Sequence, residues 1–380
     1  MEFIFENFAN LTWKHLIMYV IGIVLIYLAI SKEYEPSLLL PMGFGAILVN
    51  LPLSGVLNQV MPGIGEVQGP IQWLFETGIE AAEIMPLLLF VGIGAMIDFS
   101  PLLSRPVYFL FGAAATFGIF ATITLAVLLG FDLRDAAAIG IIGAADGPTT
   151  ILISQVLGSK YLGPIMVAAY SYMALVPIIQ PATIRLLTTK KERMIRMPIE
   201  DDKKIPKSIR IVFPIMVTVV VGFISPAAVS LIGFLMFGNL IRECTVLDSL
   251  SDTAQKTLTN IITLLLGITV AFTMQAEDFV KIDTILVMLL GLVAFILDTA
   301  GGVLFAKFIN IFLKKKINPM IGATGISAFP MSARVVQRMA LKEDPQNILL
   351  MHAVSANVSG QVSSVAASGL VLSLILSHLG

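Results

Sequence analysis

The sequence has few charged residues for its length. Of its 380 residues, 13% are Asp, Glu, Lys or Arg, whereas a soluble domain usually has about 25%. Apolar side chains make up 57% of the chain. A chain of this composition is solvated mainly by lipid, which excludes an ordinary soluble domain. The formal net charge of -1 also excludes the basic footprint of a nucleic-acid-binding protein.

Cysteine, histidine and nucleotide-binding motifs are scarce or absent. The single cysteine, Cys244, cannot form an intrachain disulfide. The three histidines lie too far apart in the sequence to suggest a metal cluster. The phosphate-binding motif G-x-x-x-x-G-K-[ST] does not occur. The chain is therefore not a self-contained ATP-driven pump, and its function must be sought in its membrane segments.

Long uncharged stretches fill most of the chain, and about 20 apolar residues suffice to span a bilayer. They occupy residues 15–31, 36–65, 84–97, 106–131, 161–184, 211–241 and 353–380, with nearly uncharged runs at 136–159, 257–276 and 284–313. Pro226 divides the longest stretch into two short helices. We expect about ten transmembrane helices. The first stretch is also compatible with a cleaved signal peptide, although acidic residues precede it and no convincing cleavage site follows.

Positively charged residues predict the orientation of these helices. Residues 185–210 are rich in Lys and Arg, and Lys314–Lys316 forms a second cluster. Both should be cytoplasmic, because positive charge accumulates on that side. No Lys or Arg occurs between Lys32 and Arg105. We therefore expect the acidic loop at 55–83 to be external.

Two segments, near 136–158 and 318–340, are expected to enter the membrane as re-entrant hairpins. With these hairpins every charge cluster obeys the orientation rule, and both termini lie outside. A faint repeat supports them, because residues 320–334 align with 141–155 and share the tripeptide I-G-A. The two halves would then cross the membrane in opposite directions, as inverted repeats do.

The expected fold is therefore an all-α integral membrane protein with two re-entrant hairpins in two inverted repeats. The first repeat covers residues 1–184 and contains the first hairpin. A basic cytoplasmic linker follows at 185–210. The second repeat covers residues 211–380 and contains the second hairpin.

Asp146 is the only charged residue between Asp135 and Lys160. A carboxylate at the bilayer centre costs at least about 2.5–3.5 kcal/mol, so it should face a cavity, a cation or a proton path. The following Gly-Pro pair breaks the helix and frees backbone carbonyls. These carbonyls and the Thr149 and Thr150 hydroxyls would suit a hard cation such as Na+. The alternative is a helix end whose aspartate reaches the lipid surface.

The second hairpin is rich in residues that disfavour a lipid-facing helix. It contains Asn318, Pro319, Gly322, Thr324, Gly325, Ser327, Pro330, Ser332 and Arg334. We expect it to line the same cavity from the cytoplasmic side. Arg334 could hold an anionic substrate with its planar guanidinium, or could serve only as a positive anchor at the interface.

Polar residues also occur in two later spans. Tyr170 and Tyr172 lie in the middle of one span, far from the interfaces that tyrosines prefer. Asn357 begins the run N-V-S-G-Q-V-S-S in the last span, and the repeat places it opposite Tyr172. The serines of this run are equally compatible with helix packing. For Asp298 a pathway role and pairing with Lys307 remain open, and His352 is expected to be a packed polar side chain.

Four motif blocks carry a resemblance to a known family. They are G-A-A-D-G-P-T (143–149), Y-S-Y-M-A-L-V-P (170–177), N-P-M-I-G-A-T-G-I-S-A-F-P-M-S-A-R (318–334) and H-A-V-S-A-N-V-S-G-Q (352–361). Together they resemble the integral membrane beta subunit of the sodium-pumping, biotin-dependent decarboxylases of oxaloacetate, methylmalonyl-CoA and glutaconyl-CoA. The resemblance covers roughly residues 84–380.

The resemblance implies an enzyme of the translocase class. In that family a carboxyltransferase (alpha) subunit moves CO2 to biotin on a carrier protein, and the beta subunit decarboxylates carboxybiotin while exporting Na+. A small gamma or delta membrane subunit accompanies them, in the cell (inner) membrane of bacteria or archaea. A homo-oligomer is compatible with this organisation.

The resemblance also implies site residues. It assigns catalytic roles to Asp146, Tyr172 and Arg334, with Arg334 also binding carboxybiotin. It assigns Na+ binding to Asp146, Asn318, Gly322, Ser327 and Asn357. The alternative function is a secondary carboxylate transporter coupled to Na+ or H+, since the same inverted repeat and buried aspartate would serve it.

Overall fold

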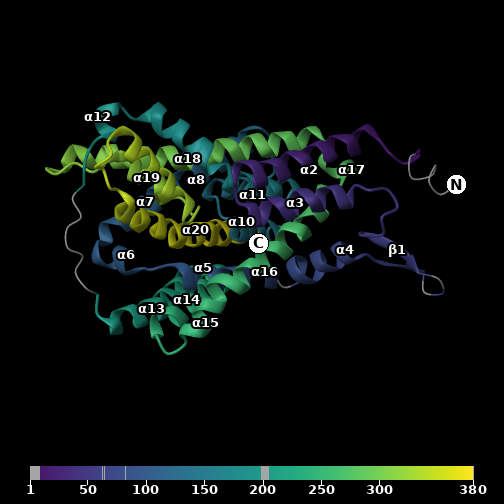
Figure 1. Ribbon diagram of the computed structural model, residues 1–380, viewed down its shortest axis with the longest axis horizontal. Coiled ribbons are helices and arrows are strands. Elements are labelled where there is room, and N and C mark those ends of the chain that lie inside the picture. The colour runs from purple at the N-terminus through teal and green to yellow at the C-terminus, as the bar shows by residue number, and fades with distance from the viewer. Residues whose placement is uncertain (1–8, 62, 64, 82, 198–204, 380) are drawn as a thin grey trace.

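Nearly all of the chain is α-helical. This computed structural model describes residues 9–61, 63, 65–81, 83–197 and 205–379. Helices suit lipid because each satisfies its backbone N–H and C=O groups internally. Among the described residues the only sheet is an antiparallel hairpin of β1 (Asn58–Met61) and β2 (Gly65–Gln68). It lies at one end of the long axis of the molecule (Figure 1).

Within the described residues, eight helical segments are long and apolar enough to cross a membrane. They are α2 (Trp13–Lys32), η2 to α8 (Pro106–Leu128), α11 (Leu162–Leu187), α13 (Lys207–Ile224), η4 with α14 (Pro226–Cys244), α15 to η6 (Asp248–Met274), α18 (Ile282–Phe312) and α20 (Leu350–Leu379). The all-α integral membrane class is thus confirmed. A ninth span results if the pair Pro70–Glu80 and Ile84–Met96, bent by 64°, is one span. Ten crossings would also require the short apolar helix α3 (Pro36–Val49), so that number stays a prediction.

The remaining elements are short or are parts of these spans. They are α4 (Pro70–Phe75), η1 (Glu76–Glu80), α5 (Ile84–Met96), α6 (Ser100–Ser104), η2 (Pro106–Tyr108), α7 (Phe109–Ala115), α8 (Phe117–Leu128), α12 (Lys190–Arg193), η4 (Pro226–Ala228), α14 (Val229–Cys244), α15 (Asp248–Asp252), η5 (Thr253–Leu258), α16 (Thr259–Val270), η6 (Ala271–Met274) and α17 (Ala276–Phe279).

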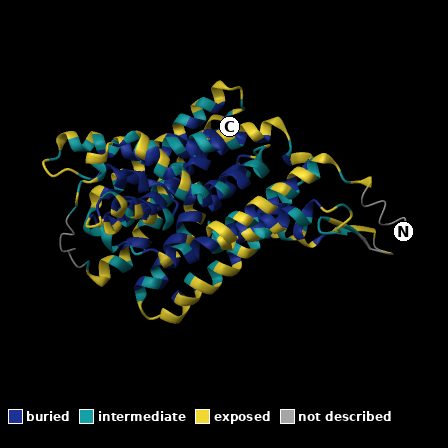
Figure 2. Cartoon of the chain, turned by 45° about the horizontal axis from the view of Figure 1, so that its top comes forward, coloured by how far each residue is buried: buried dark blue, intermediate teal, exposed yellow. Residues whose placement is uncertain are grey.

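The outward faces of the bundle are apolar. Leu186 and Phe223 are 85% and 86% exposed. A soluble protein would aggregate through so much apolar surface, whereas a bilayer covers it. Figure 2 shows buried residues concentrated where helices meet and exposed residues on the outward faces.

Helices of the two halves pack against one another in matching pairs. Helix α5 packs on α14 in the same way that α3 packs on α16. Helix α11 packs on α18, and α20 packs on α7. Neighbouring helices also match, since α2 contacts α3 and α13 contacts α14. These matching pairs are compatible with the expected inverted repeat, which stays a prediction.

Two broken helices meet in the interior. The first break separates α9 (Leu133–Ile141) and η3 (Ile142–Ala144) from α10 (Gly147–Val156). The second separates η7 (Pro319–Gly325) from α19 (Met331–Glu343). The backbone N–H of Ser327, in the second break, donates to the carbonyl of Ala144 at 3.0 Å. Residues far apart in the sequence are therefore joined at the two breaks.

Ion pairs gather at the two ends of the molecule. At the end that carries α12, Arg193 pairs with Glu343 at 2.8 Å. At the opposite end in Figure 1, near α17, Lys14 pairs with Glu277 at 2.6 Å. In the topology predicted from charge, the two residues of each pair lie on the same side of the membrane.

Candidate functional site

Asp146 lies at the first break, where it caps α10. Its Oδ2 accepts a hydrogen bond from the Thr149 hydroxyl at 2.8 Å, and its Oδ1 accepts one from the Thr149 N–H at 3.3 Å. Aspartate is a favoured N-cap, and the Gly147–Pro148 pair that follows suits the first helical turn, where no N–H donor is required. Only 5% of Asp146 is exposed. The local sequence thus places a buried carboxylate at a helix start.

Side chains of α20 satisfy the carbonyls of the second break. The Asn357 amide donates to the Ile326 carbonyl at 2.7 Å. The Gln361 amide donates to the Ser327 carbonyl. The Ser327 hydroxyl contacts the Ser364 hydroxyl. Positions 357, 361 and 364 lie on one face of a helix, because they are four and three residues apart.

A hydroxyl connects the two breaks at Asp146. The Ser364 hydroxyl donates to Asp146 Oδ2 at 3.5 Å while it also contacts Ser327. Among the described residues, no cationic side chain pairs with Asp146, and no group of three His, Cys, Asp or Glu residues could hold a metal ion. The centre therefore offers one carboxylate and several neutral oxygens. That donor set suits a hard monovalent cation better than a transition metal.

Of the residues expected to bind Na+, Asp146 and Ser327 both contact the Ser364 hydroxyl, and Asn357 donates to Ile326, the residue before Ser327. Asn318 lies elsewhere, at the start of η7, where its amide donates to the Arg193 and Ile195 carbonyls at 2.8 and 2.9 Å. It thereby attaches the linker to the second broken helix. Gly322 lies against α18, because a Cβ on Gly302 would be 2.7 Å from the Gly322 carbonyl carbon.

The two tyrosines of α11 point to different neighbours. The Tyr172 hydroxyl donates to the Met288 carbonyl of α18. Tyr170 instead packs on Gly147, since a Cβ there would lie 2.7 Å from Tyr170 Cζ. Tyr170, rather than Tyr172, therefore contacts the segment that carries Asp146.

Arg334 lies on an exposed face of α19 and lines a cavity of about 340 Å³. Lys32, Glu35, Pro177 and Arg338 also line this cavity. Burial raises the pKa of the Glu35 carboxyl above its usual range, and the positive charge of Arg334 opposes that shift. The cavity thus combines three cationic side chains with one carboxyl group whose pKa is raised.

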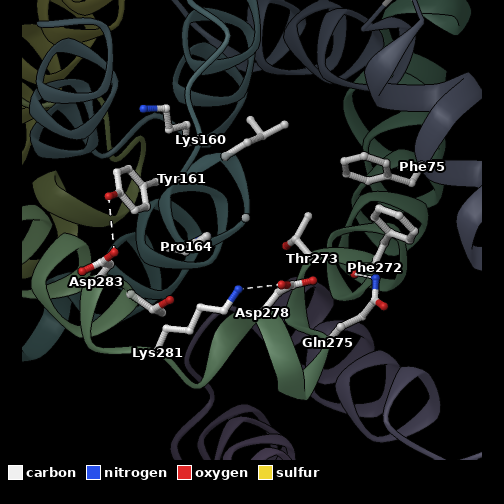
Figure 3. Close-up of a pocket in the computed structure, with 13 residues that line it drawn as sticks. Phe75, Lys160, Tyr161, Pro164, Phe272, Thr273, Gln275, Asp278, Lys281 and Asp283 are labelled. Atoms are coloured by element: carbon white, nitrogen blue, oxygen red, sulfur yellow. Dashed lines mark hydrogen bonds and ion pairs between the residues drawn. The ribbon is translucent and has the colours of Figure 1, made fainter. Parts of the chain in front are cut away.

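A second cavity, of about 510 Å³, opens at the other end of α11 (Figure 3). Lys281 pairs with Asp278 across it at 2.7 Å, and the Tyr161 hydroxyl contacts Asp283 at 3.5 Å. Gly163 lines this cavity and Pro177 lines the Arg334 cavity. Tyr170 lies seven residues from each, about 10 Å of helix rise in both directions. Asp146 lines neither cavity and is buried.

Sequence reasoning missed or undervalued three polar residues. Gln361 and Ser364 were compatible with simple packing, although their helical spacing from Asn357 was a usable signal. Gln180 was not singled out at all. Its amide donates to the Ala323 carbonyl at 2.8 Å and to the Ser332 hydroxyl at 2.6 Å. A glutamine inside an uncharged span, next to Pro181, was the available clue.

The structure also shows partners of Asp298 and His352. Lys307 pairs with Glu192 at 3.1 Å rather than with Asp298. Asp298 Oδ1 accepts from the Ile119 N–H at 3.0 Å. His352 is 3% exposed and its Nδ1 contacts the Tyr108 hydroxyl at 2.7 Å, as expected for a packed polar side chain.

Broken helices that meet around a buried carboxylate define a class of protein, the ion-handling membrane transporters. The sequence matches the family "Na+-transporting oxaloacetate decarboxylase beta subunit" over residues 14–375. The chain belongs to this family.

Similar proteins carry related names. The chain is 46% identical to a methylmalonyl-CoA decarboxylase subunit beta of Propionigenium modestum, covering 97% of this chain and 96% of that protein. It is 45% identical to a glutaconyl-CoA decarboxylase subunit beta of Acidaminococcus fermentans, with 97% and 96% covered. It is 42% identical to a probable oxaloacetate decarboxylase beta chain of Vibrio cholerae, again with 97% and 96% covered. The similarity includes the N-terminal helices, where the motif blocks gave no information.

Proposed function

We propose that this chain is the membrane subunit that decarboxylates carboxybiotin and uses the reaction to export Na+. The single observation that carries the proposal is Asp146, a buried carboxylate without a cationic partner among the described residues, at the contact of two broken helices. Membership of a Na+-transporting decarboxylase family agrees with it. The family also weighs against a secondary carboxylate carrier, since such a carrier needs no decarboxylating complex.

The Arg334 cavity is the proposed binding place of carboxybiotin. Its volume of about 340 Å³ lies within the range of small-molecule sites, roughly 300–1,000 Å³. The guanidinium of Arg334 would hold the carboxylate, and Lys32 and Arg338 add positive charge. Loss of CO2 from the N-carboxyl group leaves a nitrogen that takes up one proton. Tyr172 remains a proposed catalytic residue in the same reaction.

Asp146, Ser327 and Asn357 form the proposed Na+ site. Asn318 and Gly322 support it indirectly, because they attach η7 to the linker and to α18. Moving one positive charge outward against 100 mV costs about 2.3 kcal/mol. Ion occupancy and carboxybiotin binding must therefore favour the same conformational change. One cavity lies at the first turn of α11 and the other at Pro177 in the same helix, and Asp146 lines neither of them, an arrangement suited to alternating access.

The proposed topology places the Arg334 cavity and the 185–210 linker in the cytoplasm and the cavity of Figure 3 outside. Residues 1–184 and 211–380 are the proposed inverted repeats, with re-entrant hairpins near 136–158 and 318–340. The matching helix pairs and the ion pairs at each end support this arrangement.

The subunit names of the relatives imply a multi-subunit complex. The proposed partners are a biotin carrier protein, a carboxyltransferase (alpha) subunit and a small gamma or delta membrane subunit. The proposed location is the bacterial or archaeal cell membrane. A homo-oligomer is compatible with this proposal.

Transport in inverted vesicles tests the function. Vesicles that contain the complex should accumulate 22Na+ when its acyl substrate is added, and avidin, which blocks biotin, should abolish the uptake. Na+ uptake that is driven by a carboxylate gradient and insensitive to avidin would establish the secondary carrier instead.

A further inference from the structure

The hydroxyl of Tyr170 lacks a hydrogen-bond partner among the described residues. The residue is 1% exposed and is among the largest fully buried side chains. A buried polar group without a partner costs about 1–3 kcal/mol. Phenylalanine would fill the same space without that cost. The hydroxyl therefore requires a reason beyond packing.

The hydroxyl-bearing end of Tyr170 lies at the first break. Its Cζ lies 2.7 Å from the Cβ that any larger residue would have at position 147. Gly147 permits this approach because it has no side chain, and it directly follows Asp146. The phenol oxygen thus lies in the neighbourhood of the buried carboxylate.

A second unpartnered oxygen lies at the other break. Asn357 is 0% exposed, and its Oδ1 has no partner among the described residues although its amide nitrogen donates to Ile326. Two neutral oxygens from two different helices, one near Asp146 and one at the second break, therefore have no partner among the described residues. Such oxygens are the ligands that a hard cation takes from proteins.

We propose that the Tyr170 hydroxyl is a ligand of the cation bound at Asp146. This inference rests on the proposed function, because the cation is the exported Na+. The phenol remains neutral and gives a lone pair to the ion. Tyr170 thereby stabilises the loaded site.

The test compares Tyr170→Phe with Tyr19→Phe in the purified complex. Both changes remove one phenol oxygen within the membrane helices, but the Tyr19 hydroxyl donates to the Asn50 carbonyl at 2.7 Å, away from the breaks. Two quantities are measured: the Na+ concentration that half-saturates decarboxylation, and the unfolding temperature with and without Na+.

Tyr170→Phe should raise the half-saturating Na+ concentration about tenfold or more, which is the loss of one ligand interaction worth about 1.4 kcal/mol. Without Na+ its unfolding temperature should equal or exceed that of the wild type. Tyr19→Phe should unfold at a lower temperature and keep the wild-type Na+ response. If Tyr170→Phe does not assemble, 4-fluorophenylalanine at position 170 keeps the shape without the O–H and gives the same readout.

A wild-type Na+ response in the Tyr170 variant would overturn the inference, with or without a loss of thermal stability. A wild-type complex whose decarboxylation does not respond to Na+ would instead defeat the proposed function. The two failures are therefore distinguishable in one set of measurements.

Discussion

The two helix breaks satisfy their free backbone groups in different ways. At the first break Asp146 satisfies the start of its own helix, through hydrogen bonds from Thr149 and Thr150. At the second break the free carbonyls are satisfied from outside, by Asn357 and Gln361 of α20. The first break carries a charge and depends on local sequence. The second carries none and depends on a distant helix.

This difference suggests a division of roles. A carboxylate that is held mainly by the first turn of its own helix can exchange an ion for a proton with little rearrangement of distant helices. A break held by side chains of α20 moves only if those hydrogen bonds change. The charge of the ion site would then belong to the first break and conformational coupling to the second, with Ser364 in contact with both.

Removing the charge of the first break should have the largest effect. Asp146→Asn should lower Na+-dependent decarboxylation by roughly 100-fold or more, because the one carboxylate at the ion site is lost. The carboxyltransferase step of the complex should stay intact. Asp252→Asn, an exposed change on α15, is the control and should behave like the wild type. Na+-stimulated turnover near the wild-type rate would place the ion site elsewhere.

Removing a hydrogen bond that holds the second break should uncouple decarboxylation from Na+ export. Gln361→Leu leaves the Ser327 carbonyl without its donor, at a cost of about 1–3 kcal/mol. We expect fewer Na+ ions moved per CO2 released, together with a lower unfolding temperature. Ser373→Ala removes a hydrogen bond within the same helix and should keep the wild-type number of Na+ ions moved per CO2 released. An unchanged ratio in Gln361→Leu would show that α20 does not carry the coupling.

A smaller effect is expected at Arg334 on α19, the helix that follows the second break. Arg334→Lys keeps the charge but loses the planar fork that matches a carboxylate. It should raise the half-saturating concentration of carboxybiotin several-fold and change that of Na+ by less than twofold. Arg338→Lys, one turn further on α19 and in the same cavity, is the matched control. If both variants respond equally, the cavity binds by general positive charge rather than through Arg334.

The smallest effect should come from Glu35, which lines the same cavity as Arg334. Burial raises the pKa of Glu35 in the folded protein, so folding favours its protonated form. That contribution is present at low pH and is lost as the pH rises through the raised pKa. Glu35→Gln should therefore unfold at a slightly higher temperature than the wild type at neutral pH and at the same temperature at low pH. Glu33→Gln changes an exposed neighbour and is the control, which should keep the wild-type unfolding temperature.

The site was only partly predictable from the sequence. Asp146 followed from its isolation among uncharged residues and from the Gly-Pro pair, both local features. Gln180 did not, because its partners, Ala323 and Ser332, are about 140 to 150 residues away along the chain. Asn318 was expected beside the ion, but it contacts the linker at Arg193 and Ile195. Residue type alone does not reveal which carbonyl an amide will reach.

By itself, the sequence determined the membrane class, through its scarcity of charge, and the position of the first break, through Asp146-Gly147-Pro148. Only the tertiary structure decided which tyrosine approaches that break. Residues two apart on a helix point to nearly opposite sides, so Tyr170 and Tyr172 cannot both face it. Their side chains are identical, and the rotation of α11 between Gly147 and α18 determines that Tyr170 packs on the break while Tyr172 donates to Met288. That rotation depends on how all the neighbouring helices pack, which no local pattern specifies.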